Sequence, residues 1–129
     1  MMYKLISIAA GGAIGAVLRY GVAGVVQNYM VSMYPWGTLA VNLIGSFFAG
    51  LLWALAEYTY LPPQLKTFMF IGILGGFTTF STYMLETFHL MREGEYYLAL
   101  GNILLSNLLG IVLVFSGVIL SERIVQYFK

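Results

Sequence analysis

The segment Gly72-Ile-Leu-Gly-Gly-Phe-Thr-Thr-Phe-Ser-Thr-Tyr83 is the part of the sequence that decides the fold. It lies inside an uncharged run from 67 to 85 and places two adjacent glycines before β-branched and hydroxyl-bearing residues. Because this composition is poor for a continuous helix, we predict a break in the middle of the span. Non-helical backbone at membrane depth needs cover from protein or a water-filled cavity, and its free carbonyls then suit a cation. An ordinary helix whose threonines bond one turn back is the alternative.

Charge is scarce along the rest of the chain as well. The 129 residues include 6 basic and 5 acidic residues, and the mean hydropathy is +0.88. A soluble domain of this size would carry more surface charge, whereas a membrane-spanning helix needs about 20 apolar residues. We therefore predict an all-α integral membrane protein with a single domain of four spans. The spans are expected at about 3–28, 35–58, 64–91 and 96–120.

The charges that remain exclude some functions and leave the orientation open. A net charge of +1 without a basic cluster argues against nucleic acid as a partner, and the absence of cysteine excludes disulfides. The apolar stretch at the start continues to about Asn28, so we expect a span there and not a cleaved signal peptide. Four spans place both termini on one side, where the basic residues are Lys4, Lys66, Arg123 and Lys129. Arg92 lies opposite, and this bias is too slight to fix the orientation.

Small and polar residues form stripes at helical spacing in three of the predicted spans. Steps of four residues place side chains on one helix face. The stripes are Ser7, Gly11, Gly15 and Arg19; Thr38, Asn42 and Ser46; and Asn102, Ser106 and Gly110. Gly11-x-x-x-Gly15 and Gly72-x-x-x-Gly76 are patterns of close helix packing, so packing alone is one interpretation. Because four helices make a thin wall, we also expect a dimer built on the glycine faces.

The residues after the predicted break favour a polar path. Phe80 and Tyr83 are neighbours on one helix face, and Thr79, Thr82 and Glu86 form a second row. Ring edges, hydroxyls and amide N–H groups are neutral donors that can replace part of an anion's hydration shell without trapping it. Rings at helical spacing more often face lipid or core, and that alternative stays open, as does the protonation of Glu86.

Two other ionisable residues have open roles. Arg19 lies about 15 Å from the end of its predicted helix, where it can snorkel, pair with a carboxylate, or concentrate anions at a cavity mouth. His89 has the spacing to share a metal with Glu86 and Glu93, but a single histidine at a helix end is more often solvated. No nucleophile and base can be paired, so we do not expect an enzyme.

Three motifs in this order make the sequence similar to the Fluc (CrcB) family of small bacterial fluoride channels. They are Gly11-Gly-Ala-Ile-Gly-Ala-Val-Leu-Arg-Tyr20, Gly37-Thr-Leu-Ala-Val-Asn-Leu-Ile-Gly-Ser46 and Gly75-Gly-Phe-Thr-Thr-Phe-Ser-Thr-Tyr83. The resemblance covers essentially the whole chain. It implies a passive fluoride-selective channel in the bacterial cytoplasmic (inner) membrane that exports fluoride and lowers its toxicity. It also implies an antiparallel, dual-topology homodimer with two pores.

The same resemblance implies roles for individual residues. Backbone carbonyls of Gly75 and Thr78 from both subunits would hold a structural sodium ion at the dimer centre, and no organic cofactor is expected. Arg19 would lie at the vestibule. The pore would be lined by Asn42, Phe80, Ser81, Thr82, Tyr83, Glu86 and Ser106. Two positions depart from the family: Tyr83 stands where phenylalanine is usual, and Asn102 stands where a tyrosine is expected.

Two further functions are compatible with the sequence. A small proton-coupled multidrug exporter also has four spans and possible insertion both ways. Its coupling carboxylate is expected in the first span, where this chain has Arg19, so Glu86 would have to substitute. A non-transporting accessory subunit would use the polar stripes for packing alone.

Overall fold

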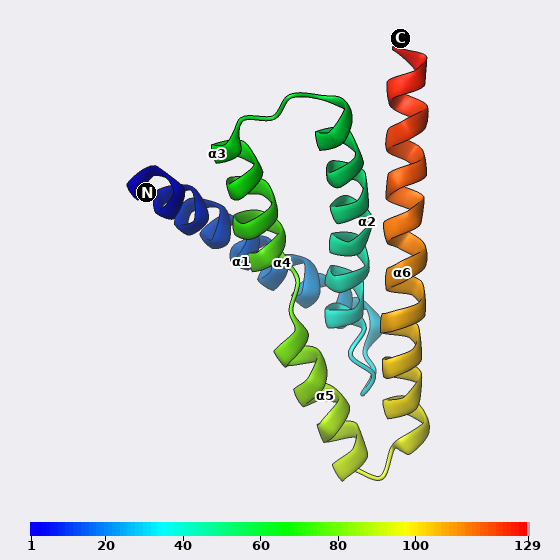
Figure 1. The fold of residues 1–129 in the computed structure, drawn as a ribbon. Helices are drawn as coiled ribbons and strands as arrows, with labels where there is room; N and C mark the ends of the chain where they lie inside the picture. The colour runs from blue at the N-terminus through cyan, green and yellow to red at the C-terminus, as the bar shows by residue number, and fades with distance from the viewer. Residues whose placement is uncertain (129) are drawn as a thin grey trace.

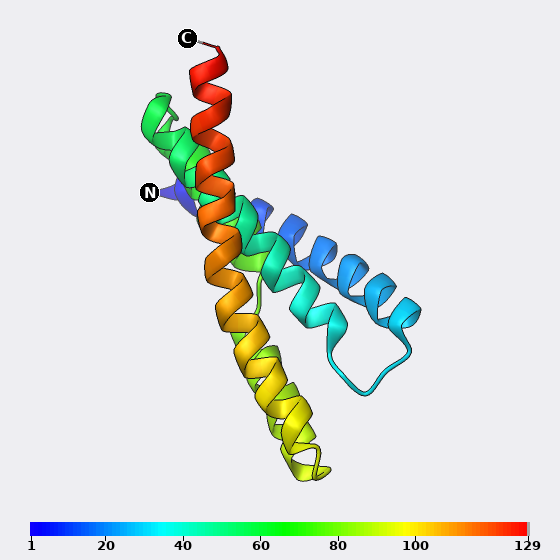
Figure 2. The same cartoon turned by 90° about the vertical axis from the view of Figure 1, so that its right-hand side faces the viewer.

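The computed structural model describes residues 1–128 and shows long helices joined by short connections (Figures 1 and 2). Four segments in this range are long and apolar enough to cross a membrane: Met2–Met30, Trp36–Tyr58, Pro63–Arg92 and Tyr96–Tyr127. The predicted all-α architecture with four possible spans is confirmed for these residues. Lys129, which contributed to the predicted charge bias, lies outside the described residues.

The helices match the predicted order and differ most at the C-terminal end. Their bounds are α1 Met2–Met30, α2 Trp36–Tyr58, α3 Pro63–Lys66, the π-helix η1 Thr67–Leu74, α4 Gly75–Phe77, α5 Phe80–Arg92 and α6 Tyr96–Tyr127. α6 continues past the expected end near Leu120 and includes Glu122 and Arg123. Both residues are good helix formers, so the first charges after an apolar run do not end the helix.

Gln27 holds the connection between α1 and α2. Its Nε2 donates to the carbonyls of Ser32 (2.8 Å) and Tyr34 (3.2 Å), and its Oε1 accepts from the backbone N of Gly37 (3.1 Å). Burial, with a smaller contribution from Tyr83, raises the pKa of the Tyr34 phenol, which lies in this connection. One amide thus fixes the start of α2 relative to the end of α1.

The third span consists of two helical arms joined by two extended residues. α3, η1 and α4 follow one another directly, after which Thr78 (φ −84°, ψ 155°) and Thr79 (φ −147°, ψ 119°) adopt extended backbone. The Thr79 hydroxyl then accepts a hydrogen bond from the backbone N of Thr82 (3.3 Å) and caps α5. Figure 1 shows α5 leaving α4 through this extended piece of chain.

Glycines bring α1 and the first arm of the third span into backbone contact. A Cβ at Gly11 would meet the Phe68 carbonyl and the Cα of Gly72, and a Cβ at Gly15 would meet the Ile73 carbonyl. The two small-xxx-small patterns therefore pack against each other within one chain. The prediction that these glycine faces build a dimer is wrong, because the chain's own helices already cover them.

α2 and α6 run side by side in the same direction (Figure 1). A Cβ at Gly50 would meet the Val114 carbonyl, and a Cβ at Gly117 would meet the Phe47 carbonyl. Close approach at both glycines therefore packs α2 and α6 against each other at backbone distance.

α5 leans away from α1 and packs against the first part of α6. In Figure 2 the connection between α1 and α2 lies well apart from the turn between α5 and α6. One face of α5 is left uncovered by the chain itself. The apolar side chains exposed on α5 are Phe80, Met84, Leu85, Phe88 and Met91. This divergence opens the space that contains the candidate site.

Candidate functional site

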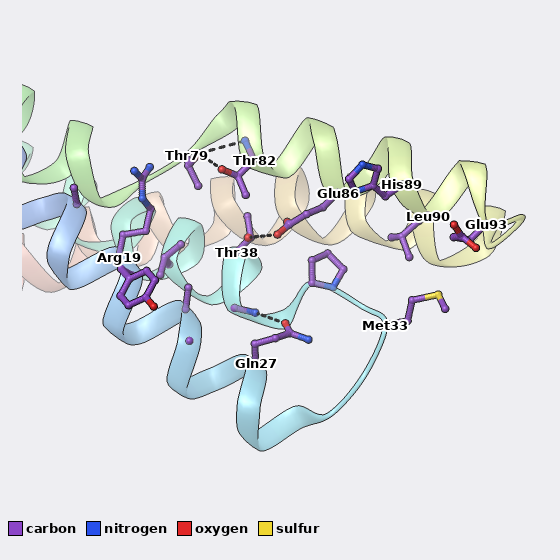
Figure 3. Close-up of a pocket in the computed structure, with 17 residues that line it drawn as sticks. Arg19, Gln27, Met33, Thr38, Thr79, Thr82, Glu86, His89, Leu90 and Glu93 are labelled. Carbon is purple, nitrogen blue, oxygen red and sulfur yellow. Dashed lines mark hydrogen bonds between the residues drawn. The ribbon is translucent and has the colours of Figure 1, made fainter.

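A polar groove of about 720 Å³ lies between α1, α2 and α5 (Figure 3). The residues that define this polar groove are Arg19, Gln27, Thr38, Thr79, Thr82, Glu86, His89 and Glu93. Figure 3 shows Arg19 at one end, beside the extended residues, and Glu93 at the other. The polar groove therefore leads from the turn after α5 to the junction of α4 and α5.

Glu86 is the half-buried acid of the polar groove, and Thr38 binds it. The Thr38 hydroxyl donates to Glu86 Oε1 at 2.7 Å. Glu86 Oε2 is buried and has no hydrogen-bond partner among residues 1–128. Thr38, from the stripe of polar residues predicted on α2, thus donates a hydrogen bond to Glu86 of the third span.

Arg19 reaches the backbone of the third span. Its Nη1 donates to the carbonyl of Thr78 at 3.3 Å. Arg19 thus bonds to a backbone carbonyl, and not to a carboxylate, which was one of the roles considered for it. The guanidinium places positive charge at the inner end of the polar groove, where it favours an anion.

A second cavity of about 460 Å³ lies at the junction of the two arms. Its lining includes Asn42 and Ser46 from α2, and Gly75, Thr78, Thr79 and Phe80 from the third span. Thr79 lines both this cavity and the polar groove. The two hollows therefore meet at Thr79, one of the two extended residues.

Asn42 binds the extended backbone through both of its side-chain polar atoms. Asn42 Nδ2 donates to the carbonyl of Thr79 at 2.9 Å, and Asn42 Oδ1 accepts from the backbone N of Thr79 at 2.8 Å. In a continuous helix, the N–H of Thr79 would bond to the carbonyl of Gly75. Asn42 therefore takes over a hydrogen bond of the helix and leaves the Gly75 carbonyl free of that donor.

A chain of polar contacts joins α5 to α6. The Thr87 hydroxyl donates to the Tyr83 carbonyl at 2.8 Å, and Asn102 Nδ2 donates to the Thr87 hydroxyl at 2.9 Å. The Ser106 hydroxyl lies 3.5 Å from Asn102 Oδ1, at the long end of a hydrogen bond. Asn107 Nδ2 donates to Tyr83 Oη at 3.1 Å. Asn102 is thus a structural donor in this chain.

All the predicted site residues except Ser81 fall into three places. Arg19, Thr82 and Glu86 lie in the polar groove, whereas Asn42, Gly75, Thr78 and Phe80 line the second cavity. Tyr83 and Ser106 belong to the contacts between α5 and α6. Ser81 is exposed on α5 and lines neither hollow.

The two predicted pore aromatics have different surroundings. Their rings touch edge to face, with centroids 5.7 Å apart. Phe80 is 73% exposed, whereas Tyr83 is 5% exposed because α6 covers it. Sequence spacing placed them on one face but did not reveal that a neighbouring helix covers one of them.

Two residues of the site were missed by sequence reasoning, and the partner of a third was not predicted. Thr87 and Asn107 are polar residues inside spans, and that is the signal by which they could have been found. Thr38 was assigned to a stripe, but its hydrogen bond to Glu86 was not predicted. His89 was expected to be solvated more often than metal-bound, and no group of three potential metal-binding side chains comes together in residues 1–128.

Comparison with known proteins extends over all of these elements. Residues 6–118 match the family model described as CrcB-like protein, Camphor Resistance (CrcB). A Parabacteroides distasonis protein named fluoride-specific ion channel FluC is 46% identical over 128 residues, covering 99% of this chain and 100% of that protein. A protein of the same name from Salinibacter ruber is 47% identical over 116 residues, which cover 90% of this chain and 87% of that protein. Another from Desulforapulum autotrophicum is 42% identical over 125 residues, which cover 96% of this chain and 100% of that protein. The chain belongs to the CrcB family.

Proposed function

We propose that this protein is a passive fluoride-selective channel and not an enzyme. The observation that carries the proposal is the match over nearly the full length to proteins named fluoride-specific ion channels. The geometry supports it, because two hollows meet at Thr79 and each presents neutral hydrogen-bond donors, Thr82 in the polar groove and Asn42 in the second cavity. Neutral donors bind a small anion weakly enough to release it.

Each hollow offers chemistry suited to fluoride. In the polar groove, Arg19 raises the local anion concentration and Thr82 supplies a hydroxyl. In the second cavity, Phe80 offers the positive edge of its ring. Asn42 Nδ2 donates one hydrogen to Thr79 and has a second hydrogen for the ion. Together these groups can replace water around fluoride in steps.

The working unit that we propose is an antiparallel, dual-topology homodimer with two pores. A single chain leaves one face of α5 uncovered, including Phe80 and the hydroxyl of Ser81. A second copy across this face would close the second cavity and bring Ser81 and Ser106 to the path. The glycine faces of α1 and η1 are already buried and are not part of this proposed contact.

A sodium ion at the dimer centre fits the backbone of the two-arm junction. Hard cations prefer oxygen ligands, and the Gly75 carbonyl lacks its helical donor because Thr79 bonds to Asn42. The Thr78 carbonyl accepts one bond from Arg19 and has a second lone pair. Gly75 and Thr78 of both subunits would hold the ion, and its charge would keep the carbonyls together.

The membrane that we propose is the bacterial cytoplasmic (inner) membrane. A negative interior potential drives an anion outward through a passive pore, so the channel would export fluoride and lower its toxicity. Efflux from vesicles loaded with fluoride tests this function. Proton-driven uptake of a cationic dye that Glu86→Gln abolishes would instead support a multidrug exporter, and vesicles impermeable to every small ion would support an accessory subunit.

A further inference from the structure

Gln27 caps the start of α2 from the end of α1. α2 begins with Trp36 after Pro35, and Pro35 makes no side-chain hydrogen bond to the helix. The first N–H groups of a helix have no partner within it, so each needs one from outside. Gln27 Oε1 accepts from the backbone N of Gly37 at 3.1 Å. A residue of α1 thus serves as the N-terminal cap of α2.

The amide of Gln27 has one possible orientation. Its Nε2 donates to the carbonyls of Ser32 (2.8 Å) and Tyr34 (3.2 Å), while its Oε1 faces the N–H of Gly37. A carbonyl only accepts and a backbone N–H only donates, so exchanging the two ends of the amide would break all of these bonds. The backbone carbonyl of Gln27 also accepts from Val31, which ends α1 with a φ of 31°. Gln27 is therefore held at both its side chain and its backbone.

Gly37 connects this cap to the polar groove. A Cβ at Gly37 would meet the carbonyl of Ala23, so the start of α2 lies against the backbone of α1. Thr38 follows directly, is 8% exposed, and donates its hydroxyl to Glu86 Oε1 at 2.7 Å. Figure 3 shows Gln27, Thr38 and Glu86 one after another in the polar groove. The cap on α2 thus sets where the donor to Glu86 lies.

Thr38 is the one hydrogen-bond partner that holds the Glu86 carboxyl in the described part of the chain. Glu86 Oε2 is buried and has no partner among residues 1–128. Glu86 shares the polar groove with Arg19, whose charge favours an anion. A carboxylate released by Thr38 would turn on its flexible stem toward this opposite charge and repel an entering anion. The hydroxyl of Thr38 therefore keeps Glu86 beside α2.

We propose that Gln27 is a positioning residue for fluoride permeation: it caps α2, places the hydroxyl of Thr38, and through Thr38 keeps Glu86 from obstructing the polar groove. The inference rests on the proposed function and deepens it, because it names a residue that keeps the path of the anion open. Both hydrogens of the Gln27 amide already bond to carbonyls, so Gln27 itself offers the anion no donor. Gln27 acts through the residues that it holds.

Fluoride efflux from vesicles that contain the purified protein tests the inference. Gln27→Met replaces the amide by an apolar side chain of similar length, and Thr38→Val removes the hydroxyl at similar size. Each is expected to lower efflux about tenfold, the lower end of what local charge does to the rate of ion entry. The double variant should lose no more than either single variant, because Gln27 acts through Thr38.

The Glu86→Gln background separates positioning from a purely structural role. Without a carboxylate to hold, Gln27→Met should change efflux by less than about twofold relative to Glu86→Gln alone. A general weakening of the fold would instead lower efflux equally in both backgrounds, and that result would overturn the inference.

Asn28→Met is the matched control on α1, since Asn28 is an exposed amide that lines neither hollow. Its efflux should equal that of wild type, and a loss as large as that of Gln27→Met would count against a specific role of Gln27. Gln27→Ala replaces Gln27→Met if size-exclusion chromatography shows that the latter does not fold.

A crystal structure of Gln27→Met supplies a readout that does not depend on transport. In this variant we expect Thr38 Oγ1 and Glu86 Oε1 to lie out of hydrogen-bond distance, and a contact kept near 2.7 Å would overturn the inference. This measurement decides between the two outcomes if Glu86→Gln itself passes no fluoride.

Wild-type efflux separates the inference from the function. A wild-type protein that passes fluoride while Gln27→Met passes it at the same rate contradicts the inference alone. A wild-type protein that passes none contradicts the channel, and the crystal structure of Gln27→Met then decides the positioning of Thr38 by itself.

Discussion

Asn42 on α2 binds both backbone polar groups of Thr79, the second of the two extended residues in the third span, at 2.9 and 2.8 Å. One amide side chain thereby replaces two hydrogen bonds that a helix would supply to the same residue. This contact allows the backbone to leave the helix at membrane depth without exposing unpaired groups to lipid.

Removing this amide is expected to destabilise the protein. Asn42→Ala leaves the N–H and the carbonyl of Thr79 unpaired, which costs about 1–3 kcal/mol for each group that finds no other partner. The thermal midpoint of unfolding in detergent should fall by several degrees. Ser46→Ala is the control, because the Ser46 hydroxyl bonds to the carbonyl of its own helix. Equal midpoints for both variants would contradict this role of Asn42.

The exposed ring of Phe80 is expected to serve transport and not stability. Phe80→Ile keeps apolar bulk and removes the ring edge, so fluoride efflux should fall about tenfold or more, for a loss of about 1.4 kcal/mol in the barrier. The unfolding midpoint should change little, because Phe80 is 73% exposed within its own chain and isoleucine keeps apolar bulk on the face that the second copy would cover. Phe88→Ile is the control on the same helix, since Phe88 is exposed and lines neither hollow. Efflux near the wild-type rate would mean that the ring only packs.

Two neighbouring glycines of α1 are expected to respond in opposite ways to alanine. Gly15→Ala would drive a methyl group into the Ile73 carbonyl, whereas a Cβ at Gly12 meets nothing within 4 Å. Gly15→Ala should cost about 1–3 kcal/mol, and Gly12→Ala should be neutral or stabilise by up to about 1 kcal/mol. Denaturation of the two variants beside wild type measures both effects. Similar losses in both would contradict the packing of α1 on η1.

Sodium is expected to stabilise the dimer. An ion that binds the folded state raises its stability with concentration, so the unfolding midpoint should rise when sodium replaces a large organic cation. Thr78→Ser should keep this response, because the proposed ligand is the carbonyl of Thr78 and not its side chain. A midpoint that is the same with and without sodium would argue against the central ion.

The spans could be predicted from the sequence because the absence of charge is a local property. Helix propensity is also a local property. Thr78 and Thr79, which lie in the segment whose composition disfavours a helix, have extended backbone. Partners were harder to predict, since the contact of Asn42 with Thr79 joins residues 37 positions apart. The acceptor of Arg19 is the backbone carbonyl of Thr78, and because every residue has a backbone carbonyl, the sequence does not indicate which one is used.

Stripes of small residues were the least informative part of the sequence. Gly11 and Gly72 could serve contacts within a chain or between chains, and composition does not distinguish the two. Asn107 was overlooked because its partner, Tyr83, lies on another helix. Both cases need the relative positions of helices, which follow from packing and not from local pattern.

The measurement that tests the central claim most directly compares fluoride and chloride efflux from vesicles that contain the purified protein, at equal salt and with a potassium ionophore to balance charge. The proposed channel should release fluoride quickly, retain chloride, and need no proton gradient. Vesicles that retain fluoride, or that release chloride as fast as fluoride, would contradict a passive fluoride-selective channel.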